Sequence, residues 1–194
     1  MALDPLTEGA TVLLSGGIDS ATVLATLLDQ SIAADCLFID YGQSAVEEEH
    51  RASAAIAEVY GCSWSVVTVT GLSVGMHEIR GRNDFLVALG MAHSDRRFVA
   101  VGTHAGIPYK DCSPSHHEAW QQLIDTQYDG IRRFVAPLQD LTKMQVWKTA
   151  VDLRVPLSLT YSCETANGPC GACPSCEDRR RLPNVGSEPG SSAR

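Results

Sequence analysis

The chain has little positive charge and no long apolar run. Its 194 residues include 15 lysines and arginines but 23 aspartates and glutamates, which gives a net charge of −8. A protein that mainly binds a nucleic-acid backbone needs a basic surface, so this balance argues against such a ligand. No apolar stretch reaches the length of a membrane span, and the opening residues, MALD, do not start a secretory signal. We therefore expect a cytoplasmic protein that does not contact membranes.

Two common nucleotide-binding motifs are also missing. The sequence has no Gly-Lys-Ser/Thr of a Walker A loop and no GxGxxG fingerprint of a dinucleotide-binding fold. It has no internal repeat either. The composition is that of an ordinary globular protein, 44% hydrophobic and 20% charged, and the length suits one domain with a sizeable core.

Short apolar runs alternate with stretches of helical periodicity. Strands are predicted at residues 10–14, 35–39, 64–69, 98–102 and 134–136. Helices are predicted at residues 20–29, 47–60, 84–93, 115–128 and 143–153, with Thr142 as the N-cap of the last. Apolar strands that alternate with helices predict an α/β fold, a three-layer, doubly wound parallel sheet. We place this single domain at residues 1–182 and expect the polar residues 183–194 to be a disordered tail.

A glycine-rich turn, Ser15-Gly16-Gly17-Ile18-Asp19-Ser20, joins the first predicted strand, which ends at Leu14, to the first predicted helix. Glycines let backbone N–H groups approach an anion, and a helix N-terminus adds unpaired N–H groups and a positive dipole end. Two serine hydroxyls add donors, and Asp19 is a candidate ligand of Mg²⁺. A helix-capping turn without a ligand is the alternative. In a parallel sheet, ligands bind at the carboxyl ends of the strands, where this turn lies, so we favour an anion site.

Four of the seven cysteines crowd near the C-terminus: Cys163, Cys170, Cys173 and Cys176. In a cytosolic protein, clustered cysteines indicate a metal site rather than disulfides. Four thiolates complete a tetrahedral Zn²⁺ site and leave no open position, so the predicted site, within a loop at residues 160–178, is structural. An iron–sulfur cluster is the competing interpretation, and free buried cysteines are a third.

Six motifs occur in one order along the chain: SGGIDS, DYGQ, RND, KDC, PLQDLTK and the four-cysteine segment. This order resembles the 7-cyano-7-deazaguanine synthases of queuosine biosynthesis, the QueC family of N-type ATP pyrophosphatases, and covers about residues 11–182. SGGxDS alone would not separate this family from NAD, GMP or argininosuccinate synthetases. The resemblance implies an adenine nucleotide alpha hydrolase-like fold.

The resemblance implies an ATP-dependent carbon–nitrogen ligase. ATP, with Mg²⁺, adenylates the carboxylate of 7-carboxy-7-deazaguanine and releases pyrophosphate. Ammonia attacks the acyl adenylate to give an amide, and a second ATP activates the amide oxygen so that its loss leaves a nitrile. The motif order includes no glutamine-hydrolysing domain, so ammonia would come from solution or from another chain.

The resemblance also assigns roles to residues. The ATP-binding residues would be Leu14, Ser15, Gly16, Gly17, Asp19, Ser20 and Lys143. The substrate-binding residues would be Tyr41, Gln43, Arg82, Asn83 and Asp111. The catalytic residues would be Asp19, Lys143, Asp111 and Cys112, and the four clustered cysteines would bind zinc. Each has an ordinary alternative: Lys143 as a solvated lysine, Cys112 as a small core residue, and Arg82 as one half of a surface ion pair.

Three departures from the family lie on the substrate side. Ser44-Ala45-Val46 stands where the family has a basic residue and a histidine, Ser113 stands where it has arginine, and the stretch at residues 70–81 is short. A second hypothesis follows, in which the enzyme stops at the amide stage and conjugates the deazapurine to a protein amine, a reaction attributed to relatives in antiviral defence operons. A third hypothesis is a non-catalytic, zinc-stapled binding module.

The remaining expectations concern surfaces. Members of the family commonly pair, so a homodimer is a further hypothesis, with Trp147 as a candidate interface residue. The adjacent His116 and His117 point about 100° apart on a helix, which argues against a shared metal, and we interpret both as helix-surface residues.

Overall fold

The computed structural model describes residues 7–72, 79 and 81–182. Five strands form one sheet: β1 (Thr7–Leu13), β2 (Ala34–Asp40), β3 (Trp64–Thr68), β4 (Arg96–Ala100) and β5 (Arg133–Val135). Six helices accompany them: α1 (Ile18–Asp29), α2 (Val46–Tyr60), α3 (Arg82–His93), α4 (Pro114–Tyr128), α5 (Lys143–Asp152) and α6 (Pro174–Arg181). Two short 3₁₀ turns, η1 (Lys110–Cys112) and η2 (Leu157–Leu159), complete the described elements.

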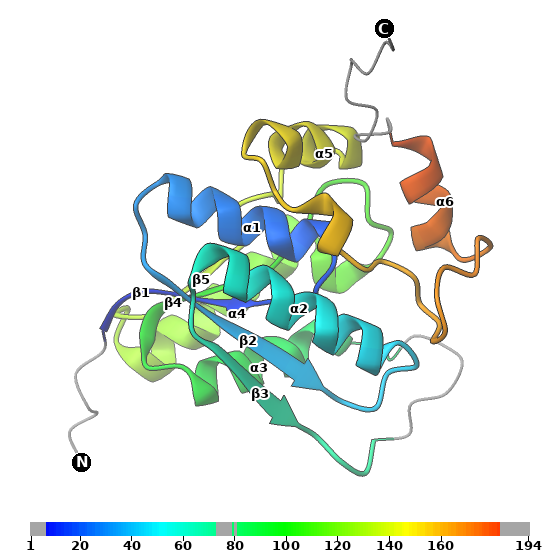
Figure 1. The fold of residues 1–194 in the computed structure, drawn as a ribbon. Helices are drawn as coiled ribbons and strands as arrows, with labels where there is room; N and C mark the ends of the chain where they lie inside the picture. The colour runs from blue at the N-terminus through cyan, green and yellow to red at the C-terminus, as the bar shows by residue number, and fades with distance from the viewer. Residues whose placement is uncertain (1–6, 73–78, 80, 183–194) are drawn as a thin grey trace, which may run out of the picture.

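The sheet is parallel throughout, in the order β3-β2-β1-β4-β5 (Figure 1). β1 is central, with β2 on one side and β4 on the other. The chain runs outward from β1 to β2 and β3, then returns past β1 to β4 and β5. The loops that follow β1 and β4 therefore diverge at the same edge of the sheet, the position where α/β sheets bind ligands.

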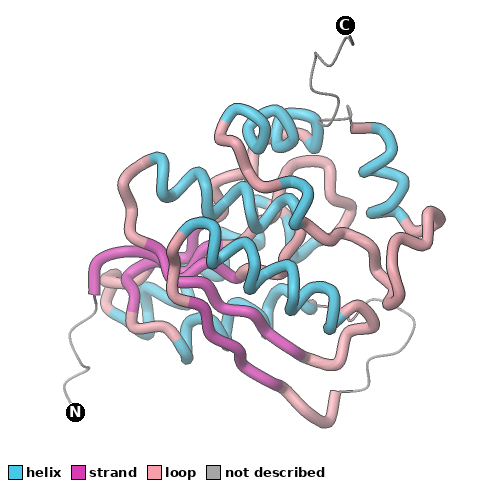
Figure 2. Tube along the Cα trace, viewed as in Figure 1, coloured by secondary structure: helices cyan, strands magenta, loops and turns pink. Residues whose placement is uncertain are grey.

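Helices cover both faces of the sheet, with α1, α2 and α5 on one side and α3 and α4 on the other (Figures 1 and 2). Successive strand residues point to opposite faces, so β1 contributes to two cores. Val12 packs in the larger core, with α1, α2 and α5, whereas Leu13 packs in the smaller core, with α3 and α4. The predicted three-layer, doubly wound α/β fold is confirmed.

The predicted elements are present, with ends that shift by a few residues. β1 begins at Thr7, and α3 begins at Arg82. The cap of α5 is as predicted: the Thr142 hydroxyl accepts from the Gln145 N–H, and the Gln145 side chain accepts from the Thr142 N–H. Neither 3₁₀ turn was predicted, nor was α6. Residues 183–194, the predicted tail, lie outside the described residues.

Two surface expectations are wrong. Trp147, expected in the core or at an interface, is only 7% exposed and packs in the larger core, so the interface alternative is the one that fails. His117 is also 7% exposed, because α4 turns this side chain toward β5, where its ring meets Phe134 edge-on. In the described part of the chain, no helix combines the length and apolar character needed to cross a membrane.

Candidate functional site

The glycine-rich turn is fixed by close backbone contacts. Gly16 has φ of +83°, and a Cβ there would lie 2.8 Å from both the Cβ of Ala52 and the carbonyl oxygen of Glu49, in α2. Only glycine fits this position. The Ser15 and Ser20 hydroxyls lie 3.1 Å apart, at the entrance of α1. The N-cap of α1, Gly17, has no side-chain cap, which leaves the helix N-terminus available to a ligand.

Lys143, which lies 124 residues after Asp19 in the sequence, contacts this turn. Its Nζ donates to both carboxylate oxygens of Asp19 at 2.7 Å, and both side chains are 29% exposed. His104 stands beside the pair, with its Nε2 4.0 Å from Asp19 Oδ2 and its Nδ1 2.8 Å from the Ala105 carbonyl oxygen. The pairing explains how a cation is stable in the first turn of α5, where the helix dipole disfavours it.

Gly102 lies against the glycine-rich turn. It was not among the predicted site residues. It follows β4, and a Cβ there would lie 2.8 Å from the backbone nitrogen of Ser20 and 3.2 Å from the Asp19 Cβ. This contact sets the distance between the loop after β4 and the N-terminus of α1. A glycine at the end of a strand beside the switch point is the sequence feature that indicates such a contact. His104, two residues later in the same loop after β4, was not predicted either.

A second cluster joins the start of α3 to η1. The Asn83 side chain donates to Cys112 Sγ at 3.2 Å, and the Asn83 backbone N–H donates to Asp111 Oδ2 at 3.3 Å. Cys112 Sγ lies 3.8 Å from Asp111 Oδ1. Cys112 is buried, while Asp111 and Asn83 are half-buried. Three of the predicted substrate-side residues are therefore in direct contact.

Gln43 and Tyr41 lie in the loop after β2. The Gln43 amide is buried and donates to the Ile39 carbonyl oxygen and to Glu49 Oε2, while its own oxygen accepts from the Tyr41 N–H. Burial raises the pKa of Glu49, against the lowering effects of the Gln43 hydrogen bond and the nearby Arg82 charge. Glu49 thus links Gln43 and Arg82 electrostatically, and it was not predicted.

The two adjacent histidines make different contacts. His117 Nδ1 hydrogen-bonds to Gln139 Oε1, and its Nε2 lies 3.3 Å from Thr103 Oγ1, so it joins the loop after β4 to the PLQDLTK segment. His116 Nε2 hydrogen-bonds to Asp84 Oδ1, which also accepts from Trp120. Hence His117 supports the segment that carries Lys143, and His116 supports the start of α3.

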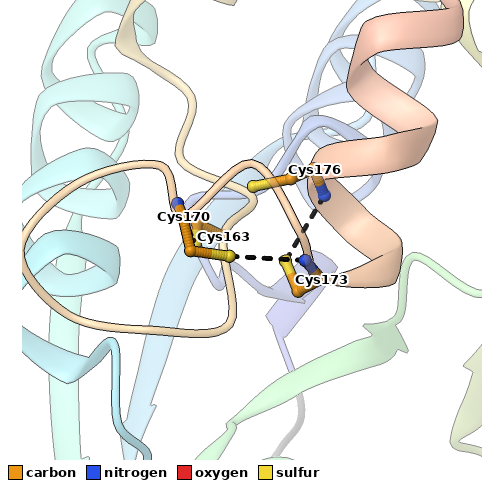
Figure 3. A group of neighbouring side chains, drawn as sticks. All are labelled: Cys163, Cys170, Cys173 and Cys176. Carbon is orange, nitrogen blue, oxygen red and sulfur yellow. Dashed lines mark hydrogen bonds between the residues drawn. The ribbon is translucent and has the colours of Figure 1, made fainter.

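The four clustered cysteines converge as predicted. Their sulfurs all lie within 4.8 Å of one another, with Cys173 and Cys176 at the start of α6 facing Cys163 and Cys170 (Figure 3). A tetrahedral zinc–thiolate site separates its sulfurs by about 4 Å. Three backbone N–H groups, of Cys170, Cys173 and Cys176, each donate to the sulfur of the preceding cysteine of the cluster.

These donors favour the thiolate form that a metal requires. Burial acts to raise the pKa of Cys163, but hydrogen bonds from Thr165 and from the Cys170 N–H outweigh it and lower the pKa to about 6. Burial raises the pKa of Cys176 to about 12. The donor set, its compactness and its partial burial fit a closed, four-thiolate metal site.

The parallel sheet, with a glycine-rich turn at its switch point, defines the class of fold as adenine nucleotide alpha hydrolase-like. Two solved structures share the fold. NMN synthetase from Francisella tularensis is 19% identical, with a TM-score of 0.53 over 86% of this chain and 71% of that one. A 4-thiouridine synthetase, solved with RNA and ATP, is 18% identical, with a TM-score of 0.55 over 94% of this chain and 48% of that one.

The sequence places the chain in one family of this class. The family described as "Queuosine biosynthesis protein QueC" matches residues 9–77 and 76–182, so the chain belongs to the QueC family. Relatives named 7-cyano-7-deazaguanine synthase include those of Synechococcus sp. (strain CC9605), 32% identical over 88% of this chain and 90% of that protein, and Prochlorococcus marinus (strain NATL2A), 31% identical over 91% and 93%. A third, from Thermoplasma volcanium, is 30% identical over 88% and 84%. The chain is thus an ATP-dependent, ligase-type enzyme rather than a non-catalytic module.

Proposed function

We propose that the chain adenylates the carboxylate of 7-carboxy-7-deazaguanine with ATP and passes the acyl group to ammonia, first as an amide and then, after a second activation, as a nitrile. The observation that carries this proposal is the Asp19–Lys143 pair at the N-terminus of α1. A cation, an acidic residue for Mg²⁺ and unpaired N–H groups meet at one point, which is what a leaving pyrophosphate needs.

In this mechanism the turn and Lys143 stabilise the charge that develops on pyrophosphate. When ATP and Mg²⁺ bind, Asp19 would hold the metal, and Lys143 would leave Asp19 to contact the β- and γ-phosphates. Ser15 and Ser20 donate hydroxyl hydrogen bonds to phosphate oxygens. The reaction converts a carboxylate oxygen, a poor leaving group, into part of AMP.

The substrate pocket in this proposal is lined by the Asn83–Asp111–Cys112 cluster, with Tyr41, Gln43 and Arg82 beside it. Arg82 supplies the positive charge that a carboxylate substrate requires. Glu49 offsets that charge in the free enzyme, because it interacts with Arg82 electrostatically.

We further propose that the four cysteines hold Zn²⁺ in a structural role. All four ligands come from the chain, so the metal has no open position for substrate and supplies no chemistry to the reaction. Metal analysis of the purified protein tests this: one zinc per chain without sulfide is expected, whereas iron with acid-labile sulfide would contradict it.

The proposal is tested by pyrophosphate release and product mass. With ATP, Mg²⁺, ammonia and 7-carboxy-7-deazaguanine, we expect pyrophosphate and a product whose mass equals that of the amide less one water. Lys143→Met should lower the rate of release by about 10²-fold, the effect of losing one charged transition-state contact. Lys148→Met is the matched control, because Lys148 is exposed on the same helix. No substrate-dependent pyrophosphate in the wild type would refute the proposal.

A second function, transfer of the acyl group to a protein amine, is favoured by the acidic start of α2. Glu47, Glu48 and Glu49 occupy its first turn, directly after the departing Ser44-Ala45-Val46 segment. Glu47 is the exposed carboxylate of this turn, and its charge would attract the ammonium group of an amine acceptor larger than ammonia. Product masses measured with candidate amine-bearing peptides decide between the acceptors: a peptide-linked amide supports this function, and nitrile formation alone excludes it.

A further inference from the structure

The segment that leads into the cysteine loop lies directly on the phosphate turn. The Tyr161 backbone N–H donates to the Gly16 carbonyl oxygen at 2.9 Å. A Cβ added at Gly17 would lie 3.6 Å from the Tyr161 carbonyl oxygen, so the segment passes close to Gly17 as well. Tyr161 precedes Cys163 by two residues. The first metal ligand is therefore joined to the phosphate turn by a very short length of chain.

A second contact joins the loop to α2. The Asn167 N–H, between Cys163 and Cys170, donates to Glu48 Oε1 at 3.0 Å. The Glu48 side chain is only 15% exposed. The same helix lies beside Gly16, where an added Cβ would be 2.8 Å from the Glu49 carbonyl oxygen, so α2 lies next to both the loop and the turn.

On its other side the segment is held by α6. Arg179 donates to the Thr160 hydroxyl at 2.7 Å and to the Leu157 carbonyl oxygen at 3.0 Å. Cys173 and Cys176 begin the same helix. A metal bound by all four cysteines would fasten α6 to the loop, and so hold the segment at residues 157–167 against the phosphate turn.

We propose that metal binding and ATP binding are thermodynamically linked, with Tyr161 and Glu48 as the positioning residues that connect the two sites. The inference rests on the ATP-binding part of the proposed function. With the metal bound, the segment before the cysteine loop keeps its hydrogen bond to Gly16, and the turn stays in its phosphate-binding conformation. Without the metal, part of the ATP binding energy is consumed in ordering the loop.

Linkage is reciprocal, which gives the proposal two independent readouts. If the metal tightens ATP binding by some factor, ATP must tighten metal binding by the same factor. Coupling between sites in proteins commonly lies between about 5-fold and 150-fold. For two backbone-mediated contacts we expect about tenfold, in the lower part of that range.

The first experiment measures zinc transfer from the full-length, zinc-loaded protein to a chromogenic chelator. ATP, saturated with Mg²⁺ to suppress its own zinc binding, should lower the apparent zinc dissociation constant about tenfold. Glu48→Ala should reduce that factor, because the Asn167 N–H loses its acceptor. Glu48→Gln is the matched control, since its side-chain oxygen still accepts, and it should keep most of the factor. Both variants meet the same ATP concentration, so residual chelation cancels.

A second experiment needs no substitution. Hydrogen exchange of the wild type, with and without metal, should show faster exchange at residues 15–20 and 157–163 after metal removal. Residues 34–40, which form β2, a buried strand between β1 and β3, are the control for global unfolding and should stay protected. Equal protection of the turn in the two states would overturn the linkage.

The outcomes separate this inference from the proposed function. The zinc assay contains no deazaguanine, so an ATP effect on zinc combined with no conversion of 7-carboxy-7-deazaguanine would refute the function alone. Bound ATP that leaves zinc affinity unchanged would refute the linkage alone. Equal coupling in Glu48→Ala and Glu48→Gln would refute the route through Glu48.

Discussion

The two halves of the site are built from different parts of the polypeptide. The half that we propose binds phosphate depends on backbone: Gly16 and Gly102 have no room for a Cβ, and the Asp19–Lys143 ion pair lies beside them. The half that we propose binds the deazaguanine depends more on side chains, such as the hydrogen bond from the Asn83 amide to Cys112 Sγ and the one from the Asn83 N–H to the Asp111 carboxylate. A backbone site tolerates few replacements, whereas a side-chain site changes residue by residue. The segments expected to depart from the family include residues 70–81, most of which lie outside the described residues, and Ser113, which directly follows Cys112 in the chain.

The largest effect is expected for Gly16→Ala. The new Cβ would overlap α2 and also require a left-handed backbone, so the turn must move. Displacements of about 1 Å cost about 10²-fold in rate, and we expect at least this loss in pyrophosphate release. Gly130→Ala is the control: Gly130 has φ of +72° but open space around it. It should lose about 1 kcal/mol of stability and no activity. Equal losses in the two variants would contradict a backbone-built site.

Asp111→Asn should act on the other half alone. The substitution removes a negative charge beside Asn83 but keeps a side-chain oxygen. The hydrogen bond from the Asn83 N–H is therefore weakened but not lost. We expect KM for the carboxylate substrate to change about tenfold, and the ATP dissociation constant to change less than twofold. Asp129→Asn, at the exposed C-cap of α4, is the matched control. A change in ATP affinity as large as that in KM would show that the halves are not separate.

Substitutions of the adjacent His116 and His117 test how strongly each half of the site depends on the hydrogen bonds of its neighbouring histidine. His117→Gln should lower the free energy of unfolding by about 1–3 kcal/mol, because buried partners on Thr103 and Gln139 lose good hydrogen bonds. His116→Gln should cost less than about 1 kcal/mol, because solvent screens its pair with Asp84, whose side chain is 41% exposed. Urea unfolding measures both. Only His117→Gln should also slow pyrophosphate release, through the segment that carries Lys143.

The smallest effect concerns a pair far from both halves, at the opposite end of the sheet. The Arg96 hydrogen bond lowers the pKa of Asp35, in spite of partial burial. A carboxyl whose folded pKa is lowered stabilises the protein above its unfolded pKa, near about 4, and loses that effect as the pH falls through the folded value. Asp35→Asn should therefore cost less than about 1 kcal/mol at neutral pH, since solvent screens the pair.

The same variant should converge with wild type in acid. Unfolding midpoints measured from neutral pH into acid test this, because the Asp35 contribution declines as the pH falls below about 4 and through the folded pKa. Neither ATP affinity nor KM should change. A difference between the proteins that grows in acid would contradict the assigned sign.

Local features made much of this structure predictable. The apolar runs predicted the strands, and Thr142 predicted the start of α5, where it forms a capping box with Gln145. The spacing of the cysteines predicted that four sulfurs lie close together. What could not be predicted depends on packing between distant elements. The burial of His117 follows from the way α4 meets β5, and the role of Gly102 from its distance to α1. The Gln43–Glu49 hydrogen bond likewise joins two residues whose neighbours in sequence do not reveal it.

The partners of the phosphate turn have a consequence for synthesis on the ribosome. The turn is among the first parts of the domain to be translated, but Lys143 is added 124 residues after Asp19, and Tyr161 is added later still. A nascent chain therefore carries the glycine turn long before it has the residues that complete it. Under the proposed function, the residues that would complete the ATP site are therefore synthesised well after the turn itself.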